Sequence, residues 1–175
     1  MANATENLIT DTIGSGGILT FDLPVDGGAS IFKGTLVTQL TGTGMLVPYS
    51  TASAGVCVGV AQHAADNASG ADGAKRCVVE TRRVYALTNG AGGDAFSEAS
   101  MIGSLVYATD DHTVADNSAT QTLKAVGFFY GMESDGKVRV LIDPHAAKIV
   151  DILQLLTDAP ASADALRENI IAAFG

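Results

Sequence analysis

The sequence predicts an all-β body, a barrel or sandwich of short strands, with an extended N-terminal arm and a C-terminal α-helical hairpin. Through the middle of the chain, short segments rich in Val and aromatic residues alternate with Gly, Ser, Asn and Asp turns, which is typical of antiparallel β proteins. Twenty glycines against four prolines indicate many tight turns. Only from residue 144 onward do apolar residues take a helical spacing. We therefore divide the chain into an arm (1–29), a β body (30–143) and a helical hairpin (144–175).

The N-terminal arm is rich in Gly, Thr and Asn, and its apolar side chains are dispersed singly or in pairs. No helical or alternating period fits the whole stretch, so it would add little to a core, yet it is too apolar for a pure linker. We expect an extended arm that lies on another protein surface. Its candidate contact residues, toward a partner protein or another copy of the chain, are Leu8, Ile9, Ile13, Ile18, Leu19 and Phe21.

The β body contains seven segments with the composition of strands. Many short strands bounded by turn residues favour a barrel or sandwich over a parallel α/β fold. Cys57 and Cys77 lie in two of these segments, and we expect buried thiols there rather than a disulfide, because we find no export signal. The predicted strands cover residues 35–40, 45–49, 55–61, 77–87, 104–109, 123–130 and 137–143.

The C-terminal residues predict two helices. Asp143 and Pro144 suit an N-cap and the first position of a helix. Thr157 to Pro160 ends this helix, and Ser162 begins the next. We expect the apolar stripe of the first helix to pack on the β body or on its partner helix. The two stripes are Ile149, Ile152, Leu153 and Leu156, then Leu166, Ile170, Ile171 and Phe174.

Charge and hydropathy exclude several classes of partner. The 175 residues carry a formal net charge of −9, and the ten Lys and Arg residues are scattered. Binding to a nucleic-acid backbone needs clustered cations, so we expect no nucleic-acid partner. No run of about 18 apolar residues is present, so we expect no membrane span. The first residues, MANATENLITD, lack the features of a secretory signal.

An internal repeat runs through the β body. Gly34-Thr35-Leu36-Val37 reappears as Gly103-Ser104-Leu105-Val106, and each copy is followed by a Val-Gly pair. The interval from the first glycine to the later one is 25 residues up to Gly59 and 24 up to Gly127. A further strand follows in each copy, and the first copy holds an extra polar loop at 63–76. The repeat predicts two structurally similar halves.

The segment TDDHTVAD offers the densest group of chemically active side chains. Asp110, Asp111, His112 and Asp116 could bind a metal ion or act in acid/base chemistry. However, adjacent turn residues tend to point apart, and the spacing matches no calcium loop. The repeat aligns Asp110 to Thr113 with Thr41-Gly42-Thr43-Gly44, a plain β-turn. We therefore predict a solvated hairpin turn without a metal, and leave open whether it touches a neighbour.

Other motifs give no catalytic or cofactor site. Residues 28–35 and 90–95 superficially resemble phosphate-binding loops, but neither is followed by a helix whose N-terminus could hold a phosphate. No Gly-x-Ser-x-Gly elbow is present, and neither cysteine has a basic, exposed setting. We expect no enzyme activity and no cofactor.

The middle of the chain resembles the small capsid decoration, or cement, proteins of tailed bacteriophages. The order and spacing of seven strings carry the resemblance over residues 30–143, and the helical hairpin departs from the family pattern. These strings are Gly34–Val37, Val58–Ala61, Val78–Glu80, Val84–Leu87, Ile102–Tyr107, Ala125–Phe128 and Val138–Ile142.

The resemblance implies a compact β-barrel or β-tulip protein on the outer surface of a phage head, made in the host cytoplasm. Its implied partners are the major capsid protein and other copies of itself, most often in a trimer, and its implied role is to stabilise the capsid lattice. Two alternatives remain. One is another virion component, such as a tail or head–tail connector subunit, and the other is a small metal-dependent hydrolase that uses Asp110, Asp111 and His112.

Overall fold

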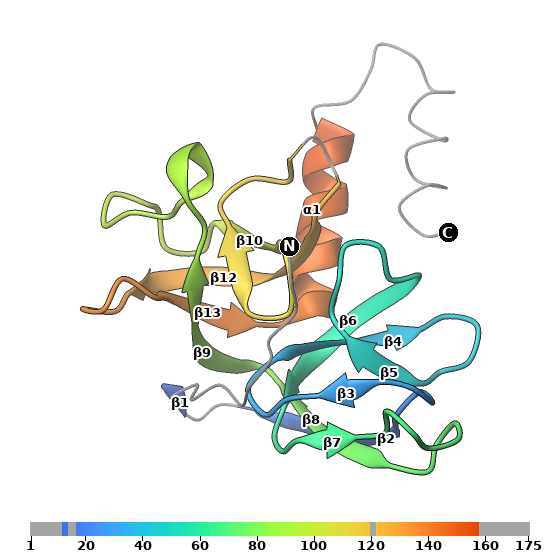
Figure 1. The fold of residues 1–175 in the computed structure, drawn as a ribbon. Helices are drawn as coiled ribbons and strands as arrows, with labels where there is room; N and C mark the ends of the chain where they lie inside the picture. The colour runs from blue at the N-terminus through green and yellow to red at the C-terminus, as the bar shows by residue number, and fades with distance from the viewer. Residues whose placement is uncertain (1–11, 14–16, 120–121, 158–175) are drawn as a thin grey trace.

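The computed structural model describes residues 12–13, 17–119 and 122–157, and within these it is built mostly of strands, with one α-helix (Figure 1). The elements from the N-terminus are β1 (Thr12–Ile13), β2 (Leu19–Pro24), β3 (Ser30–Ile31), β4 (Leu36–Leu40), β5 (Leu46–Pro48), β6 (Gly55–Ala61), β7 (Ala65–Asp66), β8 (Arg76–Thr81), β9 (Arg83–Asn89), a 3-10 turn η1 (Gly92–Asp94), β10 (Leu105–Ala108), β11 (Thr113–Ala115), β12 (Lys124–Met132), β13 (Val138–Ile142) and α1 (Pro144–Thr157). The prediction of an all-β body with strands at the seven expected places is confirmed.

The C-terminal strands form a small closed barrel, which we call unit 2. Its strands follow the order β9-β13-β12-β10-β11, and the parallel pairing of β11 with β9 closes the ring. The two strands meet at Thr113 with Thr88 and at Val114 with Asn89. The predicted barrel is therefore present in the second half of the chain.

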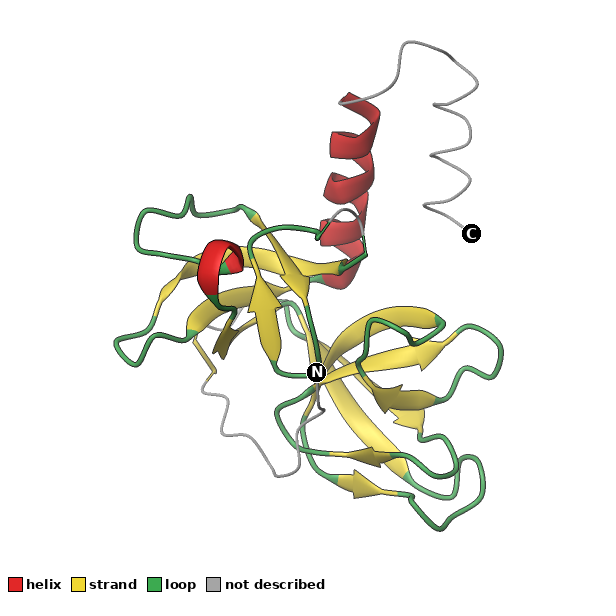
Figure 2. Ribbon diagram, turned by 45° about the horizontal axis from the view of Figure 1, so that its top comes forward, coloured by secondary structure: helices red, strands yellow, loops and turns green. Residues whose placement is uncertain are grey.

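The N-terminal strands repeat this arrangement and form unit 1. Its order is β2-β8-β6-β4-β5, and a parallel bridge between Val25 and Leu46 joins its two ends. Each strand of unit 1 therefore has a counterpart in unit 2. In chain order, β2, β4, β5, β6 and β8 correspond to β9, β10, β11, β12 and β13. The two groups of strands lie side by side in Figure 2, with α1 against unit 2.

The backbone register confirms the predicted repeat. The N–H of Gly34 donates to the carbonyl of Ala61, and that of Gly103 donates to the carbonyl of Phe129, both at 2.8 Å. Val37 lies opposite Gly59 just as Val106 lies opposite Gly127, and in both units the register shifts after that valine. Gly59 also faces the carbonyl of Glu80 on the next strand, and Gly127 faces that of Leu141. A Cβ added at either glycine would collide with this carbonyl. The two halves thus share strand order, register and a shift at the same place.

Each unit has its own apolar interior. Val37, Val58 and Val79 are among the residues inside unit 1, and Val106, Val126 and Val140 are among those inside unit 2. The extra loop of unit 1 holds the short β7, which pairs with β3. Cys57 and Cys77 are buried free thiols, as predicted. Burial raises the pKa of Cys57 to about 12 and that of Cys77 to about 11, which keeps both protonated at neutral pH.

The outer face formed by β4 and β6 of unit 1 is covered by unit 2. Leu36, Cys57 and Val60 point outward from unit 1 and belong to the same apolar cluster as the interior of unit 2. The equivalent outer face of unit 2 is covered by α1 instead. There Leu105, Tyr107 and Ala125, with Phe128 at their edge, pack against Ala147 and Val150 of the helix. The helix therefore covers the outer face of unit 2 in the same way that unit 2 covers the outer face of unit 1.

Helix α1 begins as predicted, because the carboxylate of Asp143 accepts from the N–H of Ala146 at 3.1 Å. Its predicted packing stripe is only partly correct. Ile152 is buried, but Ile149 and Leu153 are 58% and 55% exposed, since the face on the barrel is shifted toward Ala147 and Val150. The second predicted helix lies outside the described residues.

The predicted N-terminal arm is wrong in its last part. Leu19–Pro24 is not separate from the β body, because it pairs with β8 along its whole length. Thr12 and Ile13 pair with Tyr85 and Val84 of β9. The remainder of the arm, residues 1–11 and 14–16, lies outside the described residues.

The predicted strand at 77–87 is in fact two strands. Arg82 separates β8 from β9 with a φ of 59°, in the left-handed region that L-residues seldom adopt. Its N–H donates to the carbonyl of Ile142. This break carries the chain from unit 1 into unit 2.

Candidate functional site

The Asp110–His112 turn joins β10 to β11, at the place where β4 joins β5 in unit 1. One carboxylate oxygen of Asp110 accepts from the N–H of His112 at 3.0 Å and from that of Thr113 at 2.7 Å. Asp110 therefore ties the turn to itself, as Asp and Asn commonly do in turns. The predicted turn is confirmed, and so is its equivalence with the Thr41–Gly44 turn.

The predicted solvation of this turn is wrong. Asp110 is 8% exposed and Asp111 is 1% exposed, whereas Thr41, Gly42 and Thr43 of the equivalent turn are exposed. The reason is the contact between the units, because the carbonyl of Asp111 accepts from the N–H of Leu36 in β4 at 2.7 Å. The turn touches a neighbour, and this neighbour is the other unit of the same chain.

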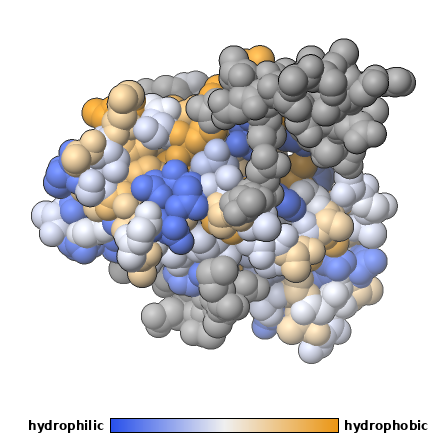
Figure 3. All heavy atoms as spheres, turned by 90° about the horizontal axis from the view of Figure 1, so that it is seen from above, coloured by the Kyte–Doolittle hydropathy of each residue, from blue (hydrophilic) through white to orange (hydrophobic). Residues whose placement is uncertain are grey.

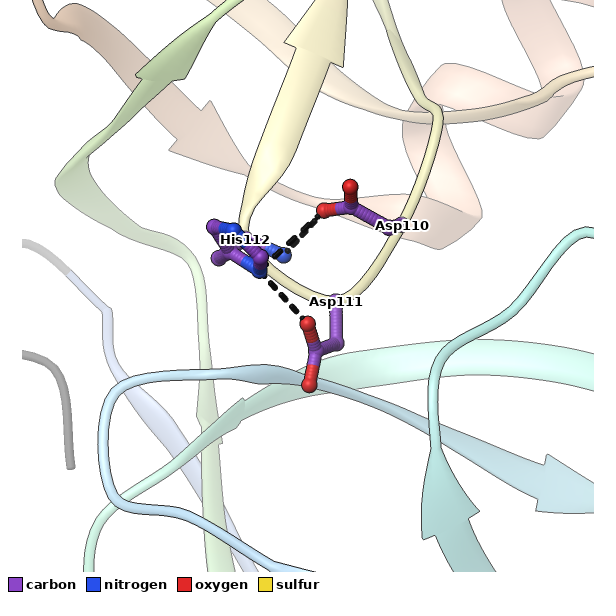
Figure 4. A group of neighbouring side chains, drawn as sticks. All are labelled: Asp110, Asp111 and His112. Carbon is purple, nitrogen blue, oxygen red and sulfur yellow. Dashed lines mark hydrogen bonds and ion pairs between the residues drawn. The ribbon is translucent and has the colours of Figure 1, made fainter. Parts of the chain in front are cut away.

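The imidazole of His112 lies between the two carboxylates (Figure 4). Its Nδ1 is 2.7 Å from Oδ1 of Asp111 and 3.2 Å from Oδ1 of Asp110. Asp116 is exposed and stands apart from these three residues, next to Asn117. The structure therefore brings together three of the four residues that the sequence singled out.

This group has the ligand types of a site for a divalent cation. One ligand atom of each residue lies within 4.8 Å of the others. An ion bound there would have to replace the short Asp111–His112 contact and share an oxygen that already accepts two backbone N–H groups. The arrangement as it stands fixes a turn at the joint between the units.

Three other polar side chains, Tyr49, Gln62 and Lys124, also form hydrogen bonds at this joint. Tyr49 of unit 1 donates its hydroxyl to the carbonyl of Ala108 at 3.2 Å, and the amide of Gln62 donates to the hydroxyl of Tyr85 at 2.8 Å. Lys124 donates to the carbonyls of Ser53 and Gly55, at 2.7 and 3.0 Å. Burial raises the pKa of Tyr49 and of Tyr85, and burial lowers that of Lys124. None of these residues had a sequence signal, because each contact joins segments far apart in the chain.

The candidate contact residues of the N-terminal segment have different environments. Leu8 and Ile9 lie outside the described residues, and Ile13 is in β1. Ile18 is half-buried, while Leu19 and Phe21 on β2 are 40% and 37% exposed. The structure therefore leaves two of the six exposed on a strand of unit 1.

The other large apolar side chains that are exposed form two further groups among the described residues. Met101, Ile102 and Tyr130 lie on unit 2, where the N–H of Gly103 donates to the carbonyl of Phe129 and brings the two segments together. Ile149 and Leu153 lie on the outer side of α1. On unit 1, Val56 on β6 is exposed as well as Leu19 and Phe21 on β2.

A hollow at the edge of unit 2 is lined mainly by small and hydroxyl side chains, including Thr51, Thr109, Thr113 and Thr122. The amide of Asn89 in its wall is bonded in both directions to the backbone of Phe96. The carboxylate of Asp94 accepts from Asn117 at 2.6 Å. The side chains of Asn89 and Asp94 are thus already bonded to protein groups behind the wall.

Comparisons with protein-family models, curated proteins and solved structures gave no match to this chain. In the part of the chain that the structure describes, no helix has the length and apolar character needed to cross a bilayer.

Proposed function

We propose that this chain is a virion structural protein that binds the outer surface of a phage head and stabilises the capsid lattice. The observation that carries the proposal is the placement of the exposed apolar side chains. They lie on three parts of an acidic molecule, namely unit 1, unit 2 and α1. A protein that sits in a lattice needs contacts with several neighbours at once.

The chemistry of the surface supports such contacts. Single exposed apolar residues are common on soluble proteins, but groups rimmed by polar residues are typical of protein interfaces. On the face shown in Figure 3, apolar side chains reach the surface between polar ones. Several weak contacts of this kind give tight attachment on a lattice, because each one raises the effective concentration of the next.

The two-unit body suits a protein that resists mechanical load. A closed barrel has no free sheet edge, and the joint between the units is built from buried apolar residues and main-chain hydrogen bonds. The major capsid protein would be the partner. The resemblance of residues 30–143 to capsid decoration proteins points the same way.

The hydrolase alternative has less support from the geometry. Its residues Asp110 and Asp111 are buried at the joint between the units, where the turn makes structural hydrogen bonds. A catalytic carboxylate must reach a substrate. A tail or head–tail connector subunit would share the same surface properties, and its position on the particle would distinguish it.

The direct test uses heads of the phage that encodes this chain, prepared without it. Purified protein added to expanded heads is expected to bind at saturable, regularly repeated positions and to raise the temperature at which the heads rupture. Absence of binding with unchanged head stability would refute the proposal.

A second experiment tests the N-terminal segment. A variant lacking residues 1–11, which include Leu8 and Ile9, is expected to keep the β circular dichroism signal and to bind heads more weakly. Unchanged occupancy on heads would show that this segment is not a capsid contact.

A further inference from the structure

The repeat makes it possible to compare surfaces between the two units residue by residue. The hydrogen bonds of Gly34 and Gly103 make Ala61 equivalent to Phe129, and so Gln62 equivalent to Tyr130. On the other side of the barrel, Phe21 pairs with Val79 as Tyr85 pairs with Val140. Phe21 is therefore equivalent to Tyr85.

The same registers place two more pairs. Val56 lies opposite Gln39 and Lys124 lies opposite Ala108, so Val56 and Lys124 are equivalent. Leu19 pairs with Thr81 as Arg83 pairs with Ile142. We call Leu19, Phe21 and Val56 the open end of unit 1.

In unit 2 the corresponding end is not open, because unit 1 covers it. Tyr85 receives a hydrogen bond from Gln62, and Lys124 reaches the carbonyls of Ser53 and Gly55. Tyr85 is 2% exposed. In unit 2, this end of the barrel therefore binds the outer face of unit 1. No described residue covers the same end of unit 1.

The receiving surface has its complement on unit 2. Unit 1 contacts Tyr85 through Gln62, whose equivalent on unit 2 is Tyr130. Helix α1 covers the centre of this outer face of unit 2, over Leu105, Tyr107 and Ala125, but its edge remains exposed. Tyr130 is 52% exposed there, together with Met101 and Ile102, and we call these three the rim of unit 2.

The side chains at both free surfaces are apolar at the positions where the internal joint has polar side-chain contacts. The Gln62–Tyr85 pair of the joint corresponds to Tyr130 and Phe21, and Lys124 corresponds to Val56. Aromatic residues at such places contribute strongly to association in water. The charged and amide groups that would favour solvation are absent from these positions.

We propose that two copies of this chain associate head to tail, with the open end of unit 1 in one copy docked on the rim of unit 2 in the next, beside α1. Phe21 of one copy then lies against Tyr130 of its neighbour. This contact joins two different surfaces, so an open chain of copies keeps one free surface of each kind, one at each end, until it closes into a ring. The proposal concerns self-association and does not depend on binding to a capsid.

The test uses two full-length variants, Phe21→Asp and Tyr130→Asp, studied by sedimentation velocity and light scattering. The unmodified protein is expected to form oligomers that dissociate on dilution, and each variant alone is expected to be monomeric. An equimolar mixture is expected to give a 1:1 dimer, because each variant keeps the surface that the other has lost.

Ile149→Asp serves as a matched control, since it places the same charge on an equally apolar and exposed position outside both surfaces. It is expected to leave the oligomers unchanged, and all three variants are checked by circular dichroism for an intact β fold. A monomeric unmodified protein, variants that still assemble, or a mixture that stays monomeric would each overturn the proposal. Loss of assembly in Ile149→Asp would instead assign the contact to α1.

Discussion

His112 lies between two carboxylates at the point where the two units meet, and its position shows how much one residue's role depends on distant parts of the chain. The repeat in the sequence predicts a turn here, and in the structure Asp110 closes this turn by accepting two backbone N–H groups. It gives no indication that Asp111 is buried, because the segment that covers it, around Leu36, is 75 residues earlier in the chain. Local pattern predicts the turn, and only tertiary contact determines its environment.

Asp111→Ala is expected to lower the free energy of unfolding by about 1–3 kcal/mol, because His112 loses a short buried partner. Asp116→Ala is the control, since Asp116 is exposed nearby, and it should change stability by less than about 0.5 kcal/mol. Urea unfolding of the two variants provides the comparison. Equal stabilities would show that the Asp111–His112 contact contributes nothing to the joint.

The Asp110–His112 group is expected to remain a structural turn when metals are supplied. Ca²⁺, Mn²⁺ or Zn²⁺ at millimolar concentration, or EDTA, should leave the melting temperature unchanged, because a ligand stabilises a protein only by binding its folded form. A rise in melting temperature that the double change Asp111→Ala, His112→Ala abolishes would establish a metal site here.

The two repeat glycines give a matched pair of substitutions. Gly59→Ala and Gly127→Ala should each cost about 1–3 kcal/mol, because the added Cβ meets a carbonyl of the neighbouring strand. Gly93→Ala meets no atom within 4 Å and should be nearly neutral. Thermal melting of the three variants measures this. A neutral Gly127→Ala would contradict the close approach of β12 and β13.

Three buried tyrosines predict instability in alkali. Burial raises the pKa of Tyr49, Tyr85 and Tyr107, and acceptance of the Tyr85 and Tyr107 hydroxyl protons by Glu80 and Asp151 adds to the shift. Because the folded pKa values exceed the unfolded value of about 10, this stabilisation is complete below pH 10 and is lost as the pH rises above it. The tyrosinate absorbance of these three residues, as distinct from that of the exposed Tyr130, should therefore appear together with loss of the β circular dichroism signal. Ionisation of these tyrosines in a protein that stays folded would contradict their burial.

Among the elements, the long Val-rich strands and the start of α1 could be predicted, and β2 could have been. Leu19, Phe21 and Leu23 alternate with polar residues, which is the period of a strand, although the segment lies within a Gly- and Thr-rich stretch. The break between β8 and β9 had no such signal, because Arg82 takes a positive φ without a glycine. The packing face of α1 was misplaced for another reason. Small Ala147 fits the barrel surface closely, whereas the larger Ile149 faces outward.

Ala147→Asp tests the role of α1 as the cover of unit 2. A charge at this fully buried contact should detach the helix, lower the 222 nm circular dichroism signal and expose the face that includes Leu105 and Tyr107 to a hydrophobic dye. Ile149→Asp, on the exposed side of the same helix, should change neither signal. Equal dye binding by both variants would show that α1 does not protect this face.

At the scale of the whole molecule, the chain is two similar units stacked in the same direction. One outer face of unit 1 is covered by unit 2, the equivalent face of unit 2 is covered by α1, and within the described part of the chain Leu19 and Phe21 of unit 1 stay exposed. Tandem repeats of this kind need a terminal cover, because each unit exposes the face that its neighbour would bury. The internal repeat could be recognised from its glycines, but the surfaces that remain exposed follow only from the assembled fold.

The measurement that tests the proposed function most directly is an electron cryomicroscopy reconstruction of phage particles assembled with this chain, compared with particles assembled without it. The account predicts additional density on the outer surface of the head, repeated at equivalent lattice positions, into which the two-unit body fits. Density at the tail or the portal vertex alone, or identical reconstructions with and without the chain, would contradict it.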